Sequence, residues 1–281
     1  MKNKVWFITG CSSGFGKIMC RQLLSRGEKV VATARNTETL KEIELLATPD
    51  QLLVLPLDVT STIQIKEVVQ KANSHFGKID VLINNAGFGQ IGALEEVSEE
   101  VVRKSFDTNV FGLIEVTRAV LPHMRSQKSG HIINLSSVAG IAAIGGAGIY
   151  AATKFAVEGL SEALAAEVAP FNIKVSLIEP GSFKTEFASG SLKTPPEMKE
   201  YDESLAATRK FYKTIGGNQP GDPEKAVSSI IALVDHPHPP LRLVLGKVAL
   251  QRVRTKIENF EKELTEWENI TMSTEFDPAL Q

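Results

Sequence analysis

Short aliphatic runs alternate with helical patterns along most of this 281-residue chain, and this alternation is what most constrains its fold. Between the runs, apolar residues recur at spacings of three and four, which is typical of amphipathic helices. Near-continuous apolar strands separated by helices form a parallel sheet that is covered on both faces. The chain is therefore predicted to be an α/β protein with a doubly wound parallel sheet, the Rossmann fold. The predicted strands cover residues 5–9, 29–34, 52–57, 81–84, 131–135 and 173–178.

The regular alternation stops after residue 180. Residues 182–222 show no clear strand and contain three prolines, and an insertion of this length is usually a lid, a binding loop or disordered. A helix over 223–234 and a last strand over 242–245 are expected to complete the sheet. We predict a single catalytic and dinucleotide-binding domain over residues 1–246, with a substrate-binding insertion at 182–222, followed by a C-terminal helical extension over 247–281.

The C-terminal extension carries an apolar stripe at helical spacing. Successive members of the stripe are three or four residues apart, which predicts an amphipathic helix. We expect the apolar face to pack on its own domain, and a contact between subunits is the alternative. The stripe consists of Leu250, Val253, Ile257, Phe260, Leu264 and Trp267.

Composition excludes several classes of protein. Lysine and arginine total 31 against 33 acidic residues, for a net charge of -2, so a nucleic-acid partner is not expected. Two cysteines, Cys11 and Cys20, do not make a disulfide framework, and the first apolar run is too short for a signal peptide. These features predict a cytoplasmic protein.

Residues 132–153 carry no charge over a length that could span a bilayer. The segment nevertheless contains Asn134, Ser136, Tyr150 and several glycines, which favours a buried strand followed by a loop of small residues. No membrane partner is expected. The five histidines show no spacing typical of a metal site, so no metal is predicted; they are His75, His123, His131, His236 and His238.

A glycine-rich turn joins the first strand to the first helix. Gly10 permits a tight turn, Gly14 lets backbone N–H groups approach a pyrophosphate, and Gly16 allows the helix to pack closely on the strand. The N-terminus of the helix adds positive potential. The sequence therefore predicts a dinucleotide site, and the residues expected from this turn are Gly10, Ser12, Ser13, Gly14, Phe15 and Gly16.

The second strand ends at Arg35 instead of at the Asp or Glu that commonly binds the ribose of NAD. A guanidinium suits a phosphate, so NADP(H) is the preferred cofactor and NAD(H) is the alternative. A solvated surface arginine is the competing explanation of Arg35. Asp58, followed by Val59, is placed to meet the adenine edge, although Asp58 could instead cap the helix that begins after Ser61.

Tyr150 and Lys154 lie four residues apart at the start of a predicted helix, so both side chains reach the same site. A nearby ammonium stabilises a phenolate, so Lys154 is expected to lower the pKa of Tyr150. The strand that ends at Leu135 delivers Ser136 and Ser137 to the same edge of the sheet as the glycine turn.

These motifs occur together in an order that resembles the short-chain dehydrogenase/reductase family, in its non-extended type. The resemblance covers about residues 4–246, and the chain is similar to hydroxysteroid and retinol dehydrogenases and to carbonyl reductases. The matching pieces are TGxxxGxG from Thr9, NNAG from Asn84, Asn109, Ser137, the Tyr150 and Lys154 pair, and Pro180-Gly181 followed by Thr185.

The resemblance assigns four catalytic residues. It implies that Tyr150 is the general acid and base, that Ser137 holds the carbonyl oxygen, and that Lys154 binds the nicotinamide ribose. Asn109 would anchor a water that relays protons, or would be a structural cap within a long helix. Ser136 is the alternative to Ser137.

The resemblance also completes the cofactor site. Pro180, Gly181 and Thr185 would fix the nicotinamide. The turn after the fourth strand would face the cofactor through Asn85, Ala86 and Gly87, or would serve to stabilise the central sheet.

The expected function is NADP(H)-dependent interconversion of an apolar secondary alcohol and ketone, or of a primary alcohol and aldehyde. A homo-oligomer, dimer or tetramer, is expected. A non-catalytic dinucleotide-sensing protein, an extended sugar-nucleotide epimerase and a membrane-bound retinoid enzyme are the alternatives. The predicted walls of the substrate cleft contain no Arg or Lys, which favours an uncharged substrate; they are Phe88, Ala142, Ala143, Ile144, Phe183 and Phe187.

Overall fold

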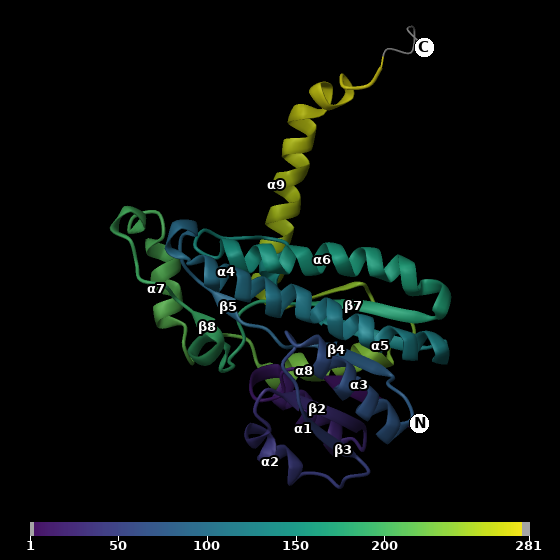
Figure 1. The fold of residues 1–281 in the computed structure, drawn as a ribbon. Coiled ribbons are helices and arrows are strands. Elements are labelled where there is room, and N and C mark those ends of the chain that lie inside the picture. The colour runs from purple at the N-terminus through teal and green to yellow at the C-terminus, as the bar shows by residue number, and fades with distance from the viewer. Residues whose placement is uncertain (1–2, 277–281) are drawn as a thin grey trace.

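Seven parallel strands form the central sheet of the computed structural model, which describes residues 3–276 (Figure 1). Their order is β3-β2-β1-β4-β6-β7-β9. This arrangement confirms the predicted doubly wound α/β fold, with a single domain. The strands are β1 (Val5–Ile8), β2 (Lys29–Ala34), β3 (Leu52–Pro56), β4 (Val81–Asn84), β6 (Gly130–Leu135), β7 (Ile173–Pro180) and β9 (Arg242–Leu245).

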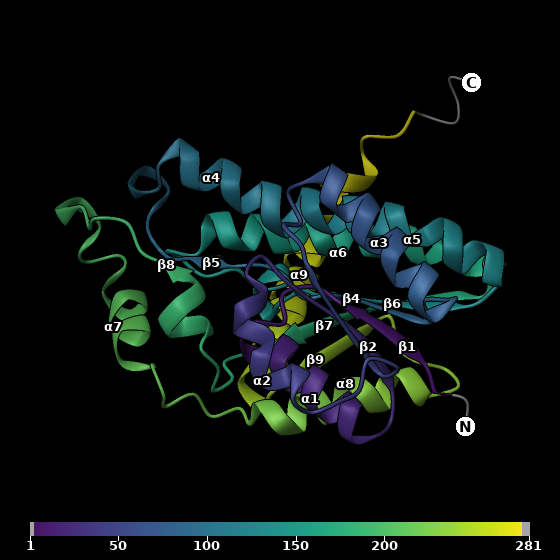
Figure 2. The same ribbon diagram turned by 60° about the horizontal axis from the view of Figure 1, so that its bottom comes forward.

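Helices cover both faces of the sheet (Figure 2). Successive side chains of a strand point to opposite faces, so Trp6 and Ile8 pack toward α1 and α8, whereas Val5 and Phe7 pack toward α3, α5 and α6. Each face thus has its own apolar core. The helices are α1 (Gly14–Ser25), α2 (Lys41–Glu44), α3 (Thr62–Phe76), α4 (Glu99–Phe106), α5 (Leu113–Gln127), α6 (Gly148–Val168), α7 (Ala206–Thr214), α8 (Pro223–Asp235) and α9 (Lys247–Met272).

The strand order reverses direction at β1. The chain first builds outward through β2 and β3, and then returns to the other side of β1 with β4. Such a switch point leaves a crevice at the carboxyl ends of the strands, where ligands of this fold bind. The glycine turn after β1 and the turn after β4 both lie at this crevice.

The uncharged segment 132–153 is a buried strand followed by a loop of small residues, as predicted. It comprises most of β6, a short 3-10 turn at Val138–Gly140 and the first residues of α6. Within residues 3–276, no helix is both long and apolar enough to cross a membrane.

The insertion 182–222 is more ordered than its composition indicates. It contains α7 and a two-residue strand, β8 (Leu192–Lys193), which pairs with β5 (Gly89–Gln90). The expectation that this segment holds no strand is therefore wrong, because two residues are too few to produce a recognisable pattern.

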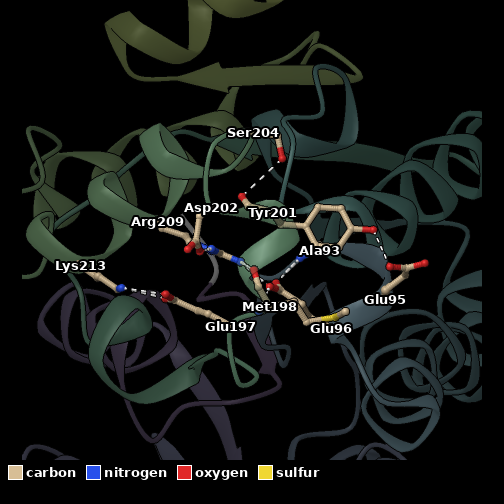
Figure 3. Close-up of polar contacts among 10 residues, drawn as sticks. All are labelled: Ala93, Glu95, Glu96, Glu197, Met198, Tyr201, Asp202, Ser204, Arg209 and Lys213. Atoms are coloured by element: carbon tan, nitrogen blue, oxygen red, sulfur yellow. Dashed lines mark hydrogen bonds and ion pairs between the residues drawn. The ribbon is translucent and has the colours of Figure 1, made fainter.

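Polar contacts fasten the insertion to the turn that precedes α4 (Figure 3). The buried Arg209 side chain on α7 pairs with Glu96 and Asp202, and Tyr201 donates a hydrogen bond of 2.8 Å to Glu95. The insertion therefore stands as a fixed wall at the carboxyl edge of the sheet.

The predicted C-terminal helix is α9, but only its first two turns pack on the domain. Ala249 and Val253 are buried against Val138 and Ile141. From Ile257 onward the apolar stripe is exposed, because α9 projects away from the body (Figure 1). The expectation that the whole stripe packs on its own domain is wrong for this part. Residues 1–2 and 277–281 of the two predicted segments lie outside the described residues.

The buried His131 on β6 makes the stability of the folded protein depend on pH. Its side chain is buried, Nε2 lies 3.0 Å from the Ser176 hydroxyl oxygen on β7, and burial lowers its pKa to about 4. Below about pH 6.5 the His131 imidazole binds a proton in the unfolded chain but remains neutral in the folded chain. This residue therefore makes the protein less stable as the pH falls from 6.5 to about 4.

We predict that His131→Gln reduces the loss of stability between pH 7 and pH 5 by about 2 kcal/mol. Chemical denaturation at the two pH values measures the difference. The control is His238→Gln, which alters an exposed histidine and should leave the loss as in the original chain. An equal loss in the His131 variant would contradict the prediction.

Candidate active site

The glycine turn packs closely against the turn after β4. A Cβ on Gly10 would lie 2.9 Å from the Ala86 Cα, and one on Gly16 would lie 2.3 Å from the Gly10 carbonyl oxygen. Gly10 also has a φ of 71°, in the left-handed region. Glycine is therefore required at both positions, by contact at each and by backbone conformation at Gly10.

Asn85 and Thr9 hold these two turns together. The Asn85 Nδ2 group donates to the carbonyl oxygens of Thr9 and Gly10, at 2.9 and 2.8 Å. The Thr9 hydroxyl accepts hydrogen bonds of 3.0 Å from the backbone N–H groups of Asn85 and Ala86. Asn85 thus has the stabilising role that the sequence left as an alternative, while it also lines the crevice.

The N-terminus of α1 already binds an anion. The Gly14 N–H donates to the Glu186 carboxylate at 3.1 Å. A helix N-terminus attracts carboxylate and phosphate for the same reasons, its unpaired N–H groups and its dipole. The carboxylate therefore stands where a pyrophosphate would be expected, and the turn fits a dinucleotide.

A cleft of about 820 Å³ runs along the carboxyl edge of the sheet. It brings together every predicted catalytic and cofactor residue except Gly16 and Asn109, which do not line it. The residues that line it are Gly10, Ser12, Ser13, Gly14, Phe15, Arg35, Asp58, Val59, Asn85, Ala86, Gly87, Ser137, Tyr150, Lys154, Pro180, Gly181 and Thr185.

Arg35 and Asp58 lie at one end of this cleft. Arg35 is exposed at its rim, so its guanidinium is accessible to a ligand. The Asp58 carboxylate accepts from the Thr60 backbone N–H at 2.9 Å and from its hydroxyl at 2.8 Å, while Ser61 caps α3. Asp58 therefore shapes the turn before the helix and is not its cap.

Tyr150 and Lys154 lie together on the first turns of α6. The Lys154 ammonium is 5.7 Å from the centre of the Tyr150 ring and donates a hydrogen bond of 2.6 Å to the Leu135 carbonyl. Burial lowers the pKa of Lys154 to about 8, and the charge of Glu158 opposes this shift. The lysine is thus held at the end of β6, with its charge against the ring.

Burial raises the pKa of Tyr150 to about 12, and the Ser137 hydroxyl opposes the rise. The expected net lowering of the Tyr150 pKa is therefore wrong, because burial is the largest influence on this group. The Lys154 ammonium lies over the ring but donates its hydrogen bond to the Leu135 carbonyl. At neutral pH the phenol remains protonated and able to donate.

The two serines after β6 have different surroundings. The Ser137 hydroxyl accepts a hydrogen bond from the Ala139 N–H at 3.1 Å. It also opposes the rise in the pKa of Tyr150. The Ser136 hydroxyl oxygen is instead buried with no hydrogen-bond partner among the described residues, and it would lie 2.8 Å from a Cβ on Gly140. The geometry thus favours Ser137 over Ser136 as the partner of Tyr150.

Asn109 lies in a π-helical segment, Asp107–Gly112, between α4 and α5. Its amide accepts from the Phe88 N–H at 3.0 Å and donates to the Phe88 carbonyl at 2.9 Å and to the Thr153 hydroxyl at 3.2 Å. The cap alternative is wrong, because the side chain joins the turn after β4 to α6. Such π-helical segments are frequent at functional sites.

A buried pair of carboxylates lies behind Lys154. Glu158 follows Lys154 by one helical turn, and Glu179 is the next-to-last residue of β7. The two carboxylates lie 3.2 and 3.6 Å from the Arg242 guanidinium on β9. Burial raises the pKa of Glu179 to about 8, and the charge of Glu158 adds to the rise. The pair therefore retains a proton near neutral pH.

Sequence reasoning missed this pair. The spacing of Tyr150, Lys154 and Glu158 at successive turns of one helix could have identified Glu158. Glu179 and Arg242 offered no such signal, because only the pairing of β7 with β9 brings them together.

The substrate end of the cleft is less apolar than expected. Phe88, Ile144, Phe183 and Phe187 line it, whereas Ala142 and Ala143 do not. The basic residues Lys104, Lys193 and Arg252 also line the cleft. The expectation of walls without Arg or Lys is therefore wrong.

Arg252 comes from α9, far along the chain from the other walls. Its guanidinium donates to the Ala142 carbonyl, and burial lowers its pKa while the neighbouring Tyr212 opposes the shift. Sequence gave no signal for this placement, since it depends on how α9 packs on the loop after β6.

Comparison with known proteins places this architecture among short-chain dehydrogenases. The family model described as short chain dehydrogenase matches residues 4–195. Human retinol dehydrogenase 8 is 39% identical over 84% of this chain and 79% of its own length. A 3-ketodihydrosphingosine reductase of Bacteroides thetaiotaomicron is 39% identical over 88% of this chain and 89% of its own length.

Solved structures agree in fold and in ligand class. A short-chain dehydrogenase from Streptomyces avermitilis is 42% identical, covers 98% of this chain and 100% of its own, and has a TM-score of 0.92. A Burkholderia phymatum relative in complex with NAD is 27% identical over 93% of this chain and 95% of its own, with a TM-score of 0.79. A Thermococcus sibiricus alcohol dehydrogenase in complex with 5-hydroxy-NADP is 26% identical over 87% and 96%, with a TM-score of 0.72.

Proposed function

The chain belongs to the short-chain dehydrogenase family of NAD(P)-dependent oxidoreductases, and we propose that it uses NADP(H) to interconvert an apolar secondary alcohol and its ketone, or a primary alcohol and its aldehyde. The observation that carries the proposal is the convergence of Tyr150, Ser137 and Lys154 on a single cleft with the glycine turn. The first two supply a proton and a hydrogen bond, and the third supplies a positive charge.

A nicotinamide held in this cleft would supply or accept the hydride. For reduction, the Tyr150 hydroxyl donates its proton to the carbonyl oxygen, and its pKa of about 12 keeps it protonated at neutral pH. The Ser137 hydroxyl holds the same oxygen. The Lys154 ammonium stabilises the phenolate that remains after proton transfer, and its pKa of about 8 keeps it charged at neutral pH.

The main test is Tyr150→Phe. The variant retains the ring and its contact with Phe187, at 6.1 Å between centres, but has no proton to donate. We expect turnover of carbonyls and alcohols to fall by about 10³-fold or more, because proton transfer and the oriented hydroxyl are both lost. NADPH binding, measured by fluorescence titration, should change little.

The control is Ser25→Ala, which also removes one hydroxyl group, from an exposed residue outside the cleft, and should turn over normally. Unchanged turnover in the Tyr150 variant would refute the catalytic assignment. An original chain that binds NADPH and turns over no member of a broad carbonyl and alcohol panel would support the non-catalytic sensing protein instead.

The choice of NADP(H) rests on Arg35. Its exposed guanidinium lies at the rim of the cleft and can form two hydrogen bonds with a 2′-phosphate. The Thermococcus relative was solved with an NADP derivative and the Burkholderia relative with NAD, so both cofactors occur in this fold.

We predict that Arg35→Ala weakens NADPH binding by about tenfold or more and NADH binding much less, because only NADPH carries the phosphate. Isothermal titration with each cofactor gives the two ratios. Arg125→Ala, which removes an exposed arginine outside the cleft, should change neither affinity. Equal losses for both cofactors would remove the argument for NADP(H).

The proposed substrate has an apolar body and a polar group that Arg252 can bind. Aromatic and aliphatic residues line the cleft together with Tyr150, and Arg252 adds a half-buried cation to the lining. Two relatives are named for retinol and for 3-ketodihydrosphingosine, each of which has a long hydrocarbon portion.

A matched pair of ketones tests this assignment. We predict that Arg252→Met raises KM by about tenfold for a long ketone that ends in a carboxylate, and by less than about twofold for one that ends in a methyl group. Lys262→Met, on the same helix outside the cleft, should leave both values unchanged. Equal effects on the two ketones would contradict a role in recognition.

A further inference from the structure

Helix α9 carries an apolar seam that the body of the protein leaves open. The exposed fractions of Ile257, Phe260, Leu264 and Trp267 are 60%, 52%, 48% and 57%. With Leu250 and Val253, these residues alternate at spacings of three and four, which is the a and d pattern of a coiled coil. A contiguous exposed apolar surface of this kind is typical of an interaction site.

The charges that flank the seam change sign along the helix. The first three turns carry Lys247, Arg252, Arg254 and Lys256, whereas the later turns carry Glu258, Glu261, Glu263, Glu266 and Glu268, with one lysine at 262. Two such helices attract each other when they run in opposite directions and repel each other when they run in the same direction.

We propose that α9 is an intersubunit helix that pairs in antiparallel fashion with α9 of a second copy of this chain. The contact is self-complementary, as a two-fold symmetric interface must be. It places the body of each subunit at the opposite end of the helix pair, which the projection of α9 away from its own body permits (Figure 1).

One register satisfies the seam and the charges together. In it, Ile257 packs against Phe260 of the second copy, and Leu250 packs against Trp267 of the second copy. Every layer then joins an a position to a d position. Val253 is the exception, because it is buried on its own domain and so fills no layer with Leu264 of the second copy.

The same register pairs opposite charges beside the seam. Arg254 faces Glu261 of the second copy, and Lys256 faces Glu263 of the second copy. In a parallel pair, Lys256 would face Glu261 of the second copy, but Glu263 would face Glu268 of the second copy, so an attractive contact would be offset by a repulsive one. The charges therefore select the antiparallel orientation.

The charges also favour a second copy over a lipid surface. Helices that lie on membranes usually carry lysine and arginine along the polar face, which anionic lipids attract. The exposed later half of α9 is mainly acidic and would be repelled.

The first experiment measures mass in solution for the full chain by light scattering and sedimentation. We expect an assembly of at least two copies, and Phe260→Glu with Leu264→Glu should reduce its mass by half. The control variant, Thr255→Glu with Asn269→Glu, adds the same charge on the outward face of α9 and should keep the original mass. A monomeric original chain, or an unchanged mass in the seam variant, would overturn the proposal.

The second experiment determines orientation by disulfide cross-linking, because the native cysteines, Cys11 and Cys20, are buried. A mixture of Leu250→Cys and Trp267→Cys chains should cross-link between the two variants. Cross-linking of Trp267→Cys chains to one another would indicate a parallel pair and refute the register.

Charge reversal and vesicles complete the test. Arg254→Glu with Lys256→Glu should weaken association by about tenfold, and adding Glu261→Arg with Glu263→Lys should restore it.

Binding of the original chain to phosphatidylserine vesicles, lost in the seam variant without a change in mass, would assign α9 to a lipid surface instead.

Discussion

The close contact between two turns at the crevice of the sheet is the constraint on which the rest of the site depends. The turn after β1 and the turn after β4 approach so closely that a single Cβ on Gly10 or Gly16 would not fit. Asn85 and Thr9 then lock the turns with hydrogen bonds. This contact aims the N-terminus of α1 into the cleft and so creates the anion site.

The electrostatics of the candidate catalytic group follow from burial. Tyr150 and Lys154 have pKa values displaced in opposite directions, each toward its neutral form, because the cleft is poorly solvated. Glu158 provides the charge that keeps the lysine cationic, and Ser137 provides the hydrogen bond that favours the phenolate. Glu158 and Ser137 therefore oppose the effect of burial on the pKa values of Lys154 and Tyr150.

Local patterns predicted the fold and most of the candidate site. The strands, the glycine turn and the spacing of Tyr150 and Lys154 are each written in a few consecutive residues, so hydropathy and motif were sufficient. Two kinds of feature were out of reach. The two-residue strand β8 is too short to produce a hydropathy pattern. The hydrogen bonds between the Asn109 amide and the Phe88 backbone depend on a π-helical segment, which no sequence pattern predicts.

By itself, the sequence determined the class of fold, the glycine turn and the candidate reactive side chains, because these follow from periodicity and from short-range geometry. Only the tertiary structure decided that Glu179 and Arg242 meet behind Lys154, that Arg252 enters the cleft, and that α9 leaves the body with its seam exposed. Those outcomes depend on contacts between residues far apart in the chain, and packing alone selects such contacts.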